Sequence, residues 1–138
     1  MEVLVASGIL MVVAATAIYA LTLTNRQAVS SRVRAAAQSI VQNQIDQILT
    51  RGPYAPTNVP PDVPAVLKTA TTNNVPVFTD PESGKLVVSG TLKTVIEDSG
   101  AKVNGTPLYV VKAGVTLDYT LAGRKQTITM NTMRAPDQ

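Results

Sequence analysis

The feature that most constrains this chain is an uncharged apolar segment close to its amino terminus. Val3 to Thr24 is a run of 22 residues without Asp, Glu, Lys or Arg, and it contains no proline. As an α-helix rising 1.5 Å per residue, the segment would be about 33 Å long, which matches a bilayer hydrocarbon core of about 30 Å. It exceeds the roughly 7 to 15 apolar residues of a cleaved signal peptide. We therefore expect the segment to stay in the working protein.

The residues after this segment have the pattern of an amphipathic helix. From Asn25 to Arg51 apolar residues recur at spacings of three and four, and Gly52-Pro53 supplies a stop signal. We predict one continuous helix, apolar on all sides in its first half and on one side in its second half. A helix of this kind needs two different environments.

Composition excludes most catalytic chemistry. The chain has no Cys and no His, which removes disulfides, thiol nucleophiles, His-based triads and most zinc sites. Only 15% of the residues are charged, and the net charge of +3 is scattered, so nothing favours nucleic-acid binding. The two acidic pairs, Asp80 with Glu82 and Glu97 with Asp98, have no His or Cys to work with as catalytic partners. We expect neither enzymatic activity nor a cofactor.

The remaining residues have the pattern of a small antiparallel sheet. Five prolines between Pro53 and Pro64 favour an extended connector, which precedes a helical turn at 65–71 and an edge strand at 75–79 weakened by proline. We expect the main sheet to begin after residue 84. Apolar and polar residues alternate over 85–97 and 109–119, and a third strand follows the turn at 122–123. The apolar stripe of the second helix half, from Val29 to Leu49, is the available cover for the apolar face of this sheet.

The predicted fold class is α+β, with a long N-terminal helix packed on a C-terminal antiparallel sheet of three to four strands. We divide the chain into an apolar helix half (1–24), an amphipathic helix half (25–52), a proline-rich connector and loop (53–84) and a sheet head (85–138). The expected core between helix and sheet consists of Val33, Ile40, Ile45, Ile48, Tyr109, Val111, Val115, Leu117 and Ile128.

Two short motifs have alternative interpretations. Asp80 and Glu82 could offer oxygens to Ca²⁺, but this ion takes six to eight ligands, so we favour an exposed turn and predict no metal site. Asn104 opens a glycosylation sequon, but Asn104-Gly105 is also a strong hairpin-turn dipeptide, and we favour the turn.

Both ends of the chain resemble one protein family. Met1-Glu2-Val3-Leu4-Val5-Ala6-Ser7 is similar to the start of mature type IV pilins, minor pilins and type II secretion pseudopilins. The residues from Gly114 to Pro136 resemble the last two strands of minor-pilin chains. Family members carry three residues before the position of Met1 and, upstream of these, a basic leader that a prepilin peptidase removes. The resemblance thus implies that the mature chain begins before Met1.

The resemblance implies a structural subunit of a helical filament, either an extracellular type IV pilus or a periplasm-spanning pseudopilus. Identical or related subunits would assemble through their N-terminal helices, and Glu2 would pair with the amino terminus, often methylated, of a neighbour. The implied partners also include the assembly or secretion machinery, and the implied location is the bacterial inner membrane and then the cell surface or periplasm. The residues expected in the filament core are Val3, Leu4, Val5, Ile9, Leu10, Val12, Val13, Ile18 and Leu21.

Two alternatives remain open at this level. Glu2 also suits a helix start, where the helix dipole favours an acid. The chain could instead be a single-pass anchored binding module that forms no filaments. Arg26, Arg32 and Arg34 would by the positive-inside rule place the C-terminal part in the cytoplasm, whereas a pilin needs the opposite orientation. A basic leader upstream would restore the orientation of a pilin.

Overall fold

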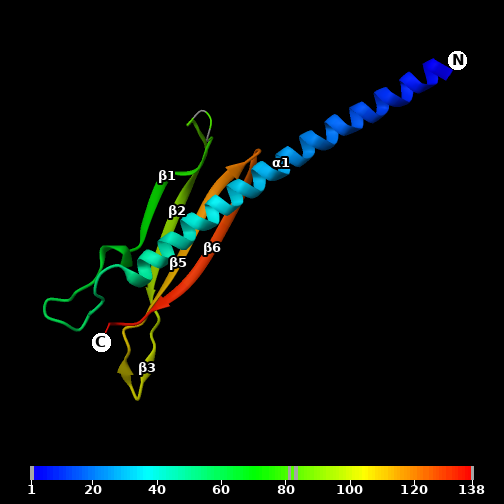
Figure 1. Cartoon of the computed structure of the whole chain (residues 1–138). Coiled ribbons are helices and arrows are strands. Elements are labelled where there is room, and N and C mark those ends of the chain that lie inside the picture. The colour runs from blue at the N-terminus through cyan, green and yellow to red at the C-terminus, as the bar shows by residue number, and fades with distance from the viewer. Residues whose placement is uncertain (1, 81, 83, 138) are drawn as a thin grey trace. The chain divides into compact units, whose positions relative to one another are not determined.

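The computed structural model describes residues 2–80, 82 and 84–137, and within the helix it describes side chains from Val5 onward. The chain forms two compact units, residues 1–34 and 35–138. The elements, labelled in Figure 1, are α1 (Glu2–Thr50), the 3₁₀ turn η1 (Ala65–Leu67), β1 (Ala70–Thr79), β2 (Leu86–Asp98), β3 (Lys102–Val103), β4 (Thr106–Pro107), β5 (Val111–Leu121) and β6 (Arg124–Arg134).

The first unit is entirely helical over its described residues. The same helix continues into the second unit without interruption and ends at Thr50, so α1 has 49 residues. No proline occurs before Pro53, and Gly52, two residues after the end of the helix, adopts a positive φ of 70°, as a C-terminal cap requires. The predicted continuous helix is confirmed.

The second unit contains a four-stranded antiparallel sheet in the order β1-β2-β5-β6. β5 and β6 form a hairpin around Ala122-Gly123, both with positive φ. A separate small hairpin joins β3 to β4 through Asn104-Gly105, whose φ angles are 50° and 83°, as a type I′ turn requires. The predicted turn at Asn104 is therefore present, and the α+β fold class is confirmed.

The core of the second unit lies between the sheet and residues 35–50 of α1, which run across one sheet face (Figure 1). On the sheet, every second residue of β5 from Ala113 to Tyr119 is buried, as expected for a strand with one covered face. Within residues 35–50 of the helix, the buried residues follow spacings of four, four and three. They are Ala37, Val41, Ile45 and Ile48.

Of the nine predicted core residues, five are buried, three are half-buried and one, Tyr109, is exposed. The buried residues are Val33, Ile45, Ile48, Val115 and Leu117, and the half-buried residues are Ile40, Val111 and Ile128.

Tyr109 corrects the sequence prediction because its side chain is 43% exposed. Tyr109 precedes the start of β5 and has a φ of 53°, so it does not share the alternation of that strand. The aromatic side chain that is buried in this region is Tyr54, whose hydroxyl donates a 2.7 Å hydrogen bond to the carbonyl of Tyr109. On the helix, Val41 is buried more deeply than the predicted Ile40, because it continues the four-residue spacing from Ala37.

The first strand is longer than the sequence predicts. β1 starts at Ala70 and takes up residues 70–71 that were expected in a helical turn, so the sheet begins before residue 84. Its pairing with β2 is irregular between Thr72 and Thr79, and Asn74 has a φ of 57°. Pro76 fits within it because β1 lies at the edge of the sheet.

A buried arginine from the last strand closes the C-terminal end of α1. Arg134 donates hydrogen bonds to the carbonyl oxygens of Ile48 at 2.9 Å, Arg51 at 3.2 Å and Gly52 at 2.7 Å. The last carbonyls of a helix have no partner within the helix and carry partial negative charge, so a guanidinium satisfies both needs. Arg134 also pairs with the carboxylate of Asp137 at 3.0 Å.

Tyr54 joins this cluster from the segment that follows the helix. Its ring lies 5.7 Å from the Arg134 guanidinium carbon, and its N–H donates to the Asp137 carboxylate at 2.9 Å. The N–H of Asp137 donates in return to the Tyr54 carbonyl at 2.9 Å. Burial raises the pKa of the Tyr54 hydroxyl, and the negative charge of Asp98 adds to the increase. The cluster thus ties the C-terminal residues to the end of the helix.

Candidate assembly surface

The candidate functional surface is the part of α1 from Val5 to Leu23, which we call the apolar span. An 18-residue window of this helix has a mean hydropathy of 2.0, and none of that window is buried. The helix is therefore long and apolar enough to cross a membrane. The exposure of the large side chains runs from 47% at Leu23 to 76% at Met11, and they are Val5, Ile9, Leu10, Met11, Val12, Val13, Ile18, Tyr19, Leu21 and Leu23.

The threonine hydroxyls of this region are satisfied within the helix itself. Thr16, Thr22 and Thr24 each donate to the backbone carbonyl four residues earlier, at 2.8 to 3.0 Å. Thr16 and Thr22 also lie 2.8 to 2.9 Å from the carbonyl three residues earlier. A hydroxyl bonded in this way needs no water, so these threonines are compatible with a surrounding of low dielectric constant.

The apolar span requires an apolar environment. Its exposed side chains occupy all sides of the helix, so no single face is left to water. Contiguous exposed apolar patches beyond a few hundred Å² mark surfaces that contact lipid or other protein. The surroundings that fit an all-round apolar helix are a bilayer and a bundle of similar helices.

The predicted filament-core residues within the described side chains all lie on this surface. Val5, Ile9, Leu10, Val12, Val13, Ile18 and Leu21 are 57% to 70% exposed. The side chains of Glu2, Val3 and Leu4 lie outside those that the structure describes. Met11 and Tyr19, which the prediction omitted, are exposed to 76% and 71%, and the unbroken apolar run was the signal that could have included them.

The two minor motifs form turns. The N–H of Glu82 donates to the Asp80 carboxylate at 3.1 Å, and the N–H of Gly84 donates to the Asp80 carbonyl at 2.8 Å. Among the described residues no group of three or more His, Cys, Asp or Glu could hold a metal ion. Asn104 is exposed in its hairpin turn.

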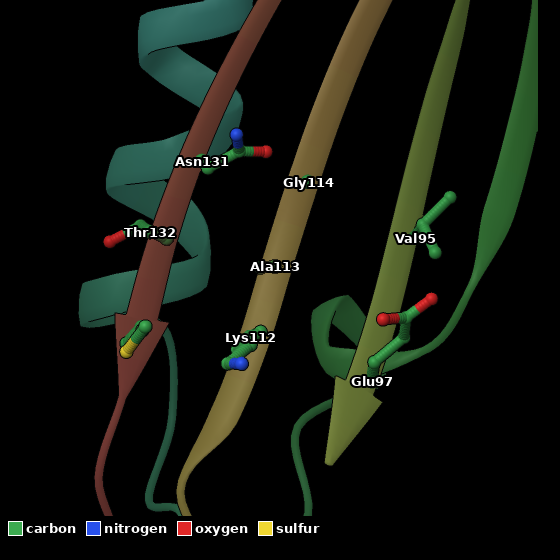
Figure 2. A pocket seen from close by; sticks show the side chains of 8 residues that line it. Val95, Glu97, Lys112, Ala113, Gly114, Asn131 and Thr132 are labelled. Atoms are coloured by element: carbon green, nitrogen blue, oxygen red, sulfur yellow. The ribbon is translucent and has the colours of Figure 1, made fainter. Parts of the chain in front are cut away.

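A hollow of about 530 Å³ lies on the sheet across β2, β5 and β6 (Figure 2). Lys112 and Gly114 of β5 alternate with the buried Ala113 and Val115, so the hollow opens on the face directed away from residues 35–50 of α1. The missing side chain of Gly114 deepens it, and the amide of Asn131 borders it. This hollow is open and would enclose little of a bound ligand. The apolar span is therefore the stronger candidate for the functional surface of the chain.

No protein family, curated protein or solved structure matches this chain. The structure itself establishes a long helix packed on an antiparallel sheet.

Proposed function

We propose that this chain is a structural subunit of a helical filament of the type IV pilin kind, and that it assembles through the apolar span of α1. The observation that supports this function best is the exposure of the apolar span on a helix that continues unbroken to Thr50. A simple membrane tether needs no continuous helix beyond the bilayer. A filament subunit uses such a helix to connect the segment in the filament core to the head.

The fold suits association of identical chains in a filament. Heterologous contacts between copies that do not close into a ring generate an open helical assembly. In such an assembly the apolar spans of neighbouring copies bury one another, and the sheets lie outside. The satisfied hydroxyls of Thr16, Thr22 and Thr24 allow those helices to enter a dry core without unpaired donors.

The same span suits a bilayer before assembly. Lipid tails are as apolar as leucine side chains, so transfer from lipid to a helix bundle keeps the span away from water throughout. The driving force for assembly must then come from close packing and from polar pairs.

Glu2 is the residue to which we assign that polar pair. It lies directly before the uncharged run of Val3 to Thr24, and a carboxylate carried to the depth of a hydrocarbon region costs several kcal/mol without a partner. An amino terminus of a neighbouring copy would offset that cost only in the correct register. Glu2 would therefore select correctly placed subunits.

The test compares Glu2→Ala and Glu2→Val with the wild type in the cells that produce this protein. Filaments sheared from the cell surface are quantified by immunoblot and electron microscopy, and membrane insertion is followed by alkaline extraction. We expect loss of most filaments with normal insertion. Glu97→Gln, which removes an exposed acid from β2, serves as the matched control and should leave filaments intact.

Two results would contradict the proposal. The first is abundant normal filaments from both Glu2 variants, which would remove the assigned role of this residue. The second is a wild-type chain that is absent from the sheared fraction and monomeric in detergent, which would favour the anchored binding module. Mass spectrometry of the amino terminus adds an independent check, because prepilin processing predicts three residues before Met1 and a methylated amine.

A further inference from the structure

Three arginines follow the apolar span directly. Arg26, Arg32 and Arg34 are all exposed, and we call them the arginine band. At about 100° per residue, the second and third lie roughly 240° and 80° around the helix from the first. The arginine band therefore presents positive charge on several sides of α1 rather than on one face.

The chain offers the arginine band no negative charge of its own along the helix. From Val3 to Ile45 the sequence contains no Asp or Glu, and the next acid is Asp46. The ion pairs of Lys125 with Asp118 and of Arg134 with Asp137 lie in the second unit and do not involve these three arginines. The three guanidinium groups thus depend on an anion from outside the chain or on water.

The first arginine of the band lies at the level of the headgroup layer of a membrane, and the other two lie beyond that layer. When the apolar span occupies the hydrocarbon core, Arg26 lies three residues, or about 4.5 Å, beyond Leu23, and each polar layer of a bilayer is about 5 to 7 Å thick. Arg32 and Arg34 are about 14 and 17 Å beyond Leu23 along the axis. Helical side chains lean toward the N-terminus, so these two arginines reach back in the direction of the headgroups.

We propose that the arginine band binds the phosphates of anionic phospholipids and holds the subunit at the bilayer surface before assembly. This inference rests on the proposed function only in placing the apolar span in a bilayer. Guanidinium groups match phosphate oxygens with paired hydrogen bonds, which makes arginine better suited than lysine to this contact. In the bilayer before assembly, a second copy of the chain is a poorer occupant, because it would bring an identical positive band to the same level and repel the first.

The test uses the full chain in vesicles and exploits its lack of cysteine, since Ser31→Cys provides a unique exposed attachment point for a donor dye beside the arginine band. The vesicles consist of phosphatidylcholine with some phosphatidylglycerol. Two preparations are compared, in which a trace of either phosphatidylglycerol or phosphatidylcholine carries the acceptor dye. Energy transfer is measured at a protein density low enough to keep chains apart. We expect transfer to labelled phosphatidylglycerol to exceed transfer to labelled phosphatidylcholine by about fivefold, because an attraction near 1 kcal/mol for one cation in the headgroup layer corresponds to a factor of about five.

Charge-matched variants decide the assignment. The triple variant R26Q/R32Q/R34Q should bring the transfer ratio to about one, and added salt should lower the wild-type ratio. The control K93Q/K102Q/K112Q removes three exposed positive charges from the second unit and should keep the wild-type ratio.

A wild-type ratio near one, or an unchanged ratio in the arginine variant, would overturn the inference. A ratio that rises with protein density and not with phosphatidylglycerol content would assign the arginine band to contacts between copies. The proposed function is judged separately: lipid preference without filaments in cells leaves the arginine band standing, and normal filaments without lipid preference overturn the arginine band alone.

Discussion

The guanidinium of Arg134 donates a 2.9 Å hydrogen bond to the carbonyl oxygen of Ile48, although the two residues are 86 positions apart in the chain. The last residue of β6 thereby completes the last turn of α1. Ile48 is itself fully buried, so one residue of the helix contributes its side chain to the core and its carbonyl to the strand. This contact makes the end of the helix depend on the end of the sheet.

Removal of the Arg134 side chain should destabilise the second unit strongly. Arg134→Ala would leave the carbonyls of Ile48, Arg51 and Gly52 without their charged donor, at an expected cost of about 3 kcal/mol. Thermal unfolding in detergent, followed by tyrosine near-ultraviolet circular dichroism, measures the change. Arg124→Ala, at the exposed start of the same strand, should stay within about 0.5 kcal/mol of the wild type. Equal losses in both variants would refute the role of Arg134 as a helix cap.

Acid should weaken the same cluster. The hydrogen bond from the Tyr54 N–H and the charge of Arg134 hold the pKa of Asp137 below its usual value. A lowered folded-state pKa contributes stability that is present above the unfolded-state pKa, near 4, and is lost as the pH falls through the folded-state pKa. The unfolding temperature should therefore decrease as the pH falls below about 4.

Asp137→Asn isolates this contribution to the acid response. The variant should be less stable than the wild type at neutral pH, and its unfolding temperature should decline less between pH 4 and pH 2. The pKa of Asp118 is also lowered, by the Thr127 hydroxyl first and by Lys125 as well, so some acid sensitivity should remain in the variant. Identical pH profiles for wild type and variant would exclude Asp137 as a contributor.

Gly90 and Gly114 should differ in their tolerance of a methyl group. A Cβ on Gly90 would lie 2.7 Å from the Asp118 carbonyl oxygen and 3.0 Å from a methyl of Leu117, so the strands would have to separate. Gly90→Ala should cost about 1 to 3 kcal/mol. At Gly114 the nearest atom is the side-chain oxygen of Asn131 at 3.1 Å, which can move. Gly114→Ala should therefore be the milder change in a urea titration, and the reverse order would contradict the close strand approach at Gly90.

A charge inside the apolar span should prevent its burial. Ile18→Glu places a carboxylate five residues inside the end of a span that the proposal assigns to lipid or a filament core, at a cost of up to about 2 to 3 kcal/mol. Gln38→Glu introduces the same charge at an exposed position of the same helix and is the control. We expect the first variant alone to lower the fraction of chain that resists alkaline extraction. Full retention of Ile18→Glu in membranes would contradict burial of this span.

Features encoded within a few residues were predictable from the sequence. The absence of proline and the four-residue spacing of apolar residues determine α1, and Gly52-Pro53 marks its end. The turn at Asn104-Gly105 and the alternation along β5 are equally local. The apolar span could be predicted for the same reason, because a segment that is apolar on all sides needs no fold to define its surface.

Only the tertiary structure decided which distant residues meet. Tyr54 is buried in place of the predicted Tyr109, because β5 begins only after Tyr109. The hydroxyl of Tyr54 reaches the carbonyl of Tyr109, 55 positions along the chain, and no local pattern encodes this hydrogen bond. The burial of Arg134 depends on three carbonyls that become available only when the end of α1 reaches β6. Periodicity specifies the face on which a residue lies, but the partner of a polar group is selected by packing, since a buried charge persists only where the fold supplies its hydrogen bonds.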